Sequence, residues 1–176
     1  MLAALLSVAL FSQAQFTRAT LQATGLTCAM CSNAINKALQ KVDFVESVRS
    51  DIKNSSFSIV FKSNTEQNID AIRDAVEDAG FSVGSLKLTG QFTDIRLEKD
   101  RHVKIGNGNF LFLNGEGQSL NGEKEITVVD KSFLSEKQFK KISASSKMSC
   151  VQTGKAGACC EKDGIGSGER VYHVTI

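Results

Sequence analysis

The sequence contains no proline and no tryptophan, and its 176 residues include only two histidines and one tyrosine. Without proline, the chain has no X–Pro bond that could adopt the cis form, which excludes any active site built around a cis-proline. No set of serine, histidine and aspartate, no phosphate-binding loop and no pair of catalytic carboxylates stands out. These absences predict that the protein is not an enzyme.

An excess of one charge sign is also missing, because the net charge is only +2. Residues 15–88 carry eight basic and eight acidic side chains, and residues 89–176 carry thirteen and eleven. Proteins that bind nucleic acid present a strongly basic surface, often with interleaved aromatic residues. We therefore predict that nucleic acid is not a partner.

The longest apolar run is at the N-terminus, where residues 2–11 are apolar except for Ser7. This run is shorter than the ~20 residues needed to span a bilayer. Ser12 and Ala14 then place small residues at the two positions that a signal peptidase reads. We predict a cleaved signal peptide over residues 1–14 and a mature protein that is periplasmic or secreted and does not span the membrane. No basic residue precedes the run, and a buried N-terminal helix is the alternative.

The most informative feature is the pair Cys28 and Cys31, which lies between a strand-like and a helix-like segment. Two thiols two residues apart at such a turn can converge on one ion. A helix start favours the thiolate, the form that binds metal. Soft sulfur ligands select soft ions such as Cu(I), and they also bind the less soft Zn(II). The same spacing is also found in thiol–disulfide oxidoreductases, although their fold places a cis-proline opposite the cysteine pair.

Hydrophobic periodicity predicts an α+β domain over residues 15–88. Apolar residues alternate in the strand-like segments and recur at helical spacing in the two others. The expected order is strand 17–23, helix 31–42, strand 45–53, strand 57–61, helix 69–79 and strand 81–88. This βαββαβ order is the ferredoxin-like arrangement, in which two helices cover one face of a four-stranded sheet.

Residues 19–88 resemble the heavy-metal-associated domain family of copper chaperones, copper-transporting P-type ATPase modules and periplasmic mercuric-ion binding proteins. The resemblance rests on the motif at residues 25–31, the helix that follows it, and residues 78–81 at the end of the second helix. It implies that Cys28 and Cys31 bind the metal ion and that the partner is a metal donor or acceptor protein, either a transporter or a chaperone.

Two positions carry further implications of the resemblance. The family usually has Met where this chain has Leu26, a side chain that packs under the loop and is not a ligand. At the position of Phe81 the family has either Lys, typical of cytosolic chaperones, or an aromatic residue, typical of ATPase modules and mercuric proteins. Phe81 therefore favours a protein other than a free cytosolic chaperone.

Residues 89–176 are predicted to form a separate, small, mainly-β domain with an OB-like barrel as the best-matching fold. Strand-like segments occur at residues 91–97, 103–105, 110–113, 125–129 and 170–176, and turns are expected at residues 114–117 and 121–122. Ser135 and Gln138 form a capping-box pattern at the start of one helix.

A second group of cysteines, Cys150, Cys159 and Cys160, lies in a glycine-containing loop of this segment. One interpretation is a disulfide from Cys150 to either later cysteine, which would stabilise the loop by about 2–3 kcal/mol. The other is a second soft-metal site, assisted by Met148 or His173. Spacing alone does not separate the two.

The two histidines, His102 and His173, are predicted to be surface residues of strands. Neither has a second histidine or a carboxylate at the sequence spacing of a metal site.

The sequence thus predicts an exported protein that holds and transfers Cu(I), with Hg(II) or Zn(II) as other thiophilic candidates, through Cys28 and Cys31. A thiol–disulfide oxidoreductase using the same pair, and a metal-sensing or partner-docking module, are the alternatives. The native metal and the direction of transfer stay open.

Overall fold

A computed structural model of the protein describes residues 14–26 and 28–176, so most of the predicted signal peptide lies outside the described residues. The first half contains six elements: β1 (Gln15–Thr24), α1 (Ala29–Leu39), β2 (Val45–Asp51), β3 (Ser56–Phe61), α2 (Ile69–Asp78) and β4 (Ser82–Arg96). The second half contains β5 (His102–Ile105), β6 (Gly108–Phe112), β7 (Ser119–Val128), η1 (Lys131–Phe133), α3 (Glu136–Ser143), α4 (Cys150–Thr153), η2 (Glu161–Asp163) and β8 (Val171–Thr175). Among the described residues, no helix is long and apolar enough to cross a membrane.

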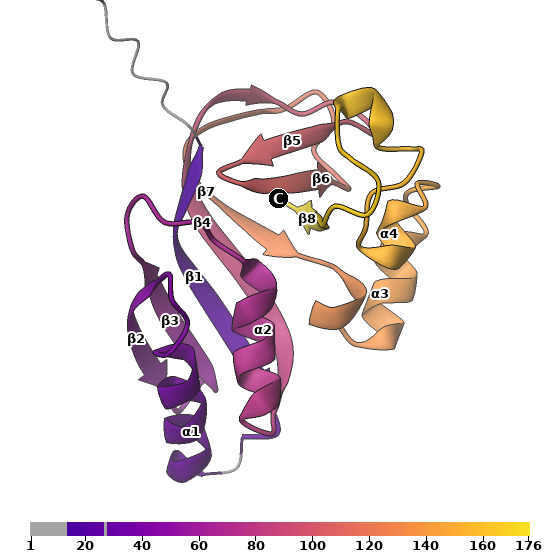
Figure 1. Ribbon diagram of the computed structural model, residues 1–176. Coiled ribbons are helices and arrows are strands. Elements are labelled where there is room, and N and C mark those ends of the chain that lie inside the picture. The colour runs from indigo at the N-terminus through magenta and orange to yellow at the C-terminus, as the bar shows by residue number, and fades with distance from the viewer. Residues whose placement is uncertain (1–13, 27) are drawn as a thin grey trace, which may run out of the picture.

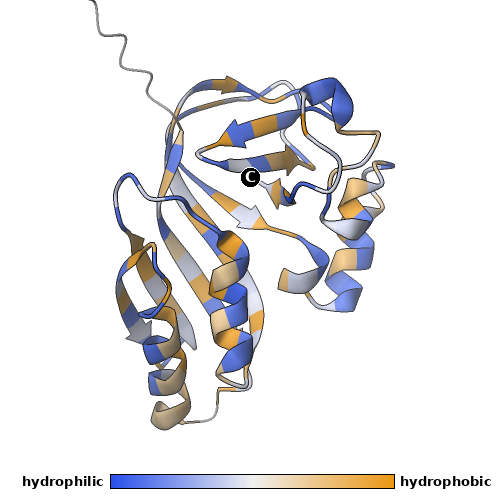
Figure 2. Ribbon diagram, viewed as in Figure 1, coloured by the Kyte–Doolittle hydropathy of each residue, from blue (hydrophilic) through white to orange (hydrophobic). Residues whose placement is uncertain are grey.

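The first half confirms the predicted ferredoxin-like order. Strands β2, β3, β1 and β4 are neighbours in that order and all pair antiparallel. Helices α1 and α2 lie side by side on one face of this sheet (Figure 1). Apolar and polar residues alternate along the strands (Figure 2), so one face of each strand is buried under the helices. The core includes Leu21, Ile35, Phe57, Ile72 and Leu86, each fully buried.

Strand β4 is longer than the sequence predicts, because it runs on through Gly90 to Arg96. An added Cβ at Gly90 would lie 2.7 Å from the Gln15 carbonyl oxygen, so glycine permits the close approach of β1 to β4. Strand β4 pairs with β7 from Leu86 to Arg96, and the sheet continues through β8, β6 and β5 to eight strands. The predicted domain boundary at residues 88/89 therefore falls inside a strand, and the division into two domains stays a prediction.

The predicted OB-like barrel is not confirmed. In the part of the chain that the structure describes, β5 to β8 extend an open sheet, and β6 and β8 pair in parallel. The turn predicted at residues 121–122 is also wrong, because Gly122 lies within β7 and faces Phe92 of β4. These strands are held by pairings between residues far apart in sequence, which local periodicity does not reveal.

A second, smaller core cluster lies beneath α3, α4 and the cysteine-containing loop. It includes Leu111 of β6, Phe139 of α3, Val151 of α4 and Val171 of β8. The predicted capping box of α3 is confirmed, with the Gln138 amide donating to Ser135 Oγ and the Ser135 amide donating to Gln138 Oε1. This cluster positions the three cysteines of the second group.

One arginine links the two halves of the chain. The Arg170 guanidinium donates to both carboxylate oxygens of Asp70 at 2.7 and 3.0 Å and to Asp130 Oδ2 at 3.1 Å. It also lies over the Tyr172 ring, 4.2 Å from the ring centroid. Burial alone would raise the pKa of the Asp70 carboxyl. The hydrogen bond and the positive charge of Arg170 outweigh this effect, so the pKa is lower than usual. The start of α2 is thus tied to the last strand of the sheet.

Candidate metal site in the first loop

The first loop leaves β1 and enters α1 through a sharp turn. Gly25 has φ of +81°, a conformation that glycine adopts at no steric cost. Cys28 is the extended N-cap residue of α1, and its carbonyl accepts a hydrogen bond from the Ser32 amide at 3.3 Å. Cys31 follows in the first helical turn. The local sequence therefore directs both cysteines to the same end of the helix.

The two thiols lie together at the surface. Their Sγ atoms are 3.0 Å apart, with Cys28 exposed and Cys31 half-buried. Two sulfurs that share an ion at metal–sulfur bonds of about 2.3 Å are separated by about 3.8 Å in a tetrahedral site and by more in a linear one. The exposed Cys28 side chain can widen the pair by rotation, so the geometry suits a small ion held at the surface.

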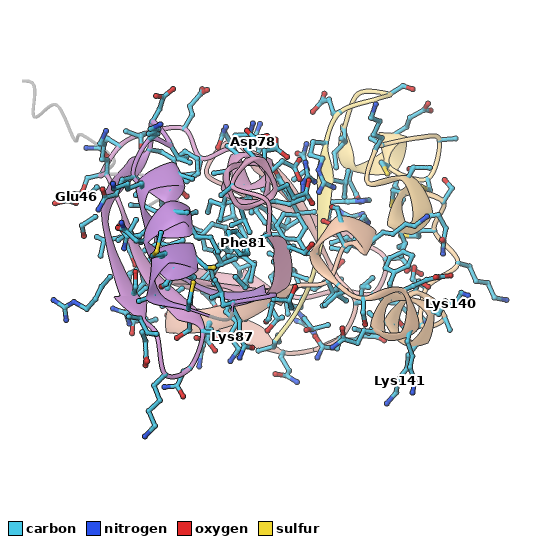
Figure 3. All side chains as sticks on the ribbon, turned by 90° about the horizontal axis from the view of Figure 1, so that it is seen from below. Glu46, Asp78, Phe81, Lys87, Lys140 and Lys141 are labelled. Atoms are coloured by element: carbon cyan, nitrogen blue, oxygen red, sulfur yellow. The ribbon has the colours of Figure 1, made fainter. Side chains whose placement is uncertain are left out.

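The surroundings of the pair are apolar on the protein side. No acidic residue lies in the first turn of α1, so no carboxylate opposes a thiolate there. Leu26 and Phe81 are partly buried against the main core, and an added Cβ at Gly25 would lie 3.9 Å from the Phe81 ring. Figure 3 looks onto this end of the molecule and shows Phe81 beside α1. Met30, which lies between the two cysteines in sequence, is 82% exposed.

Part of the chain is similar to known proteins. Residues 20–82 match the family model of the heavy-metal-associated domain. The copper-transporting ATPase RAN1 of Arabidopsis thaliana is 38% identical over 77 residues, which are 40% of this chain and 8% of that protein. The copper chaperone CopZ of Staphylococcus aureus (strain MRSA252) is 29% identical over 63 residues, which are 36% of this chain and 91% of the chaperone.

A solved copper-binding domain from HMA7, a P-type ATPase, is 30% identical and covers 41% of this chain and 92% of that domain, with a TM-score of 0.35. The chain spans less than a tenth of the length of the copper-transporting ATPases that it matches. The similarity is thus to the heavy-metal-associated domain and covers residues 20–82 of the chain.

The second cysteine group is brought together by the fold, with one residue that the sequence reasoning missed. Cys159 and Cys160 have their Sγ atoms 3.4 Å apart. The ligand atoms of His102, Cys150 and Cys160 all lie within 4.8 Å of one another. The prediction that His102 is a surface residue is wrong, because its side chain is only 2% exposed. Its partner Asp163 is 61 residues away, and no local spacing could have paired the two.

His173 and Met148, the two residues expected to assist the second cysteine group, are not part of the His102–Cys150–Cys160 group. His173 is fully buried, which makes the prediction of a surface residue wrong, and its Nδ1 lies 2.5 Å from Asp130 Oδ1. Met148 is buried in the same small core cluster as Cys150.

The three thiols of the second group are predicted to differ in reactivity. Burial raises the pKa of Cys150 and of Cys160 above the usual value. Burial alone would raise the pKa of Cys159 as well. Hydrogen bonds from Ser149 and from the Cys150 amide outweigh this effect and lower the pKa to about 7. In reduced, metal-free protein, brief alkylation with iodoacetamide should therefore label Cys159 well before the other two. The rate at Cys159 should rise as the pH increases to about 7 and then level off, because the thiolate is the nucleophile.

Peptide mapping by mass spectrometry after a short pulse measures this order. Equal labelling of Cys150 and Cys159 at pH 7 would contradict the geometry of the loop.

Proposed function

We propose that this protein binds one soft metal ion between Cys28 and Cys31 and passes it to another protein. The observation that carries the proposal is a pair of surface thiols 3.0 Å apart at the start of α1 in a heavy-metal-associated domain. Cu(I) is the first candidate, because sulfur ligands favour it and because the relatives are named as copper chaperones and copper-transporting ATPases. Hg(II) and Zn(II) are the other thiophilic candidates.

Transfer would proceed by ligand exchange. Two thiolates leave the ion with open coordination positions, and the exposed Cys28 lies on the side from which a partner can approach. A partner thiolate binds the ion, a protein thiolate dissociates, and the ion moves across without being released to water. The half-buried Cys31 would leave last. The expected partner is a metal donor or acceptor, either a chaperone or a transporter.

We also propose that the chain is exported and has no catalytic activity of its own. The apolar run and small residues of the N-terminal segment support export, and β1 begins at Gln15, directly after the predicted cleavage position. Against the oxidoreductase alternative, the chain has no proline to place opposite the cysteine pair. Turnover in an insulin-reduction assay would contradict the non-enzymatic proposal.

Ligand exchange has a kinetic signature that dissociation lacks. When Cu(I)-loaded protein is mixed anaerobically with an isotopically labelled, metal-free second copy of the chain, NMR reports the ion reaching the labelled copy. We expect a rate that increases in proportion to the concentration of the acceptor, because the acceptor thiolates take part in the exchange. The matched control is a Cys28→Ser, Cys31→Ser acceptor, which should receive no ion in its first loop. A rate that does not depend on acceptor concentration would contradict transfer by direct exchange.

A further inference from the structure

The fold brings the ligand atoms of His102, Cys150 and Cys160 within 4.8 Å of one another, at a distance from the first loop, and Cys159 Sγ lies 3.4 Å from Cys160 Sγ. Cys150 begins α4, Cys159 and Cys160 precede η2, and His102 begins β5. Figures 1 and 3 both show α4 and α1 on opposite sides of the molecule. This cluster, the α4 cluster, is therefore separate from the Cys28–Cys31 loop.

The distances within the α4 cluster match those of a metal site. Cys150 Sγ lies 3.9 Å from His102 Nε2, and Cys159 Sγ lies 3.4 Å from Cys160 Sγ. Ligands at zinc–sulfur bonds of about 2.3 Å and zinc–nitrogen bonds of about 2.0 Å are about 3.5–3.8 Å apart at the corners of a tetrahedron. Shifts of a few tenths of an ångström would thus bring these pairs to tetrahedral spacing. Cys159 is half-buried and its Sγ also lies 3.4 Å from Ser149 Oγ, so binding would require this side chain to turn from Ser149 toward the other three ligands.

A buried carboxylate orients the histidine of the cluster. Asp163 Oδ2 accepts the His102 amide at 3.0 Å and lies 2.7 Å from His102 Nδ1. An ionised carboxylate only accepts hydrogen bonds, so Nδ1 donates in this contact, and Nε2 is the ring atom that faces Cys150, 3.9 Å from its Sγ. This carboxylate–histidine arrangement recurs behind metal-bound histidines, where it fixes the tautomer and the ring.

Most of the cluster is closed to solvent, and Cys159 is its half-buried cysteine. Cys150 and Cys160 are fully buried, and the side chains of His102 and Asp163 are 2% and 5% exposed. Three cysteines and one histidine around a closed site are a donor set of structural zinc sites, whereas the exposed pair in the first loop suits transfer.

We propose that His102, Cys150, Cys159 and Cys160 form a structural Zn(II) site, with Asp163 as the residue that positions His102. The ion would tie β5, α4 and η2 together and thereby stabilise the loop between α3 and β8. The site does not depend on the function proposed for Cys28 and Cys31.

The test uses the full chain with the first loop disabled by Cys28→Ser and Cys31→Ser. This reduced double variant should bind one Zn(II) in competition with a chromophoric chelator. With Co(II) as the probe, it should show a sulfur-to-metal charge-transfer band and the intense visible bands of tetrahedral Co(II). Added separately to this background, His102→Asn, Cys159→Ser and Asp163→Asn should each weaken Zn(II) binding by at least about tenfold. Lys162→Ala, an exposed residue of the same turn, is the matched control and should leave the affinity unchanged.

Circular dichroism verifies that each variant is folded, and Cys159→Ser removes only a half-exposed side chain. The proposal is overturned if the double variant binds no Zn(II), or if His102→Asn and Cys159→Ser leave its affinity unchanged. Two other results would also overturn it: binding of Cu(I) but not Zn(II) at these residues, or isolation of the protein with Cys150 in a disulfide to Cys159 or Cys160. None of these results depends on whether the first loop binds copper.

Discussion

Replacing Cys28 and Cys31 together with serine should reduce the affinity of the first loop for Cu(I) by at least about 100-fold. Loss of a single supporting contact around a metal site typically costs 10–100-fold, and this variant removes both thiolates. A 100-fold loss corresponds to about 2.7 kcal/mol of binding free energy. Competition with a Cu(I)-specific chelator under anaerobic conditions measures it.

The fold should tolerate this change, because Cys28 is exposed and Cys31 half-buried, and neither belongs to the main core. The matched control is Met30→Leu, which keeps both thiols and removes only an exposed thioether. It should change the affinity by less than about threefold if the thioether is not a ligand. An unchanged affinity in the double serine variant, measured with the α4 cluster filled with Zn(II), would show that the first loop is not the copper site.

Replacing Arg170 with methionine should lower the free energy of unfolding by about 3–5 kcal/mol, because it removes one partner from a largely buried ion pair. The Asp130 side chain is only 4% exposed and that of Asp70 19% exposed, so both carboxylates lose the Arg170 charge where water screens them little. Asp70 keeps its second partner, Arg73, at 2.9 Å. The stacking of the guanidinium on Tyr172 is lost as well. Urea denaturation of the full chain measures the change.

The control is Arg18→Met, the same substitution at a surface pair. Arg18 lies 2.7 Å from Glu123, but both side chains are about half exposed, so we expect a loss below about 1 kcal/mol. The pH dependence supplies a second readout. The folded pKa of Asp70 is lowered, so its contribution is present above the usual value of 3.8 and is lost as the pH falls through the lower folded value. This acid-dependent loss should be smaller in Arg170→Met. Equal destabilisation by the two substitutions would contradict the linking role of Arg170.

The first half of the fold could be predicted from sequence because its pattern is local. Helical spacing places Ile35 and Leu39 on the buried face of α1, and strict alternation places Phe57, Ile59 and Phe61 on one face of β3. The position of Cys28 and Cys31 at a strand-to-helix turn follows from the same local signals.

The second half could not be predicted in this way because its structure depends on contacts distant in sequence. Glycine usually weakens a strand. Gly90 nevertheless allows β4 to continue, because it has no side chain to collide with β1. His102 appears isolated in sequence, and only the fold brings Asp163 and Cys150 to its two ring nitrogens. The cysteine spacing predicted either a disulfide or a metal site at Cys150, Cys159 and Cys160, but it did not indicate that His102 lies beside them.

The central claim is that Cys28 and Cys31 hold one soft ion jointly, and X-ray absorption at the copper edge tests it most directly. The chain is loaded with Zn(II) to fill the α4 cluster and then with one equivalent of Cu(I). The account predicts Cu(I) bound by two sulfur atoms, with this signal lost in the Cys28→Ser, Cys31→Ser variant. Copper surrounded by nitrogen or oxygen, or a two-sulfur signal that survives in the variant, would contradict it.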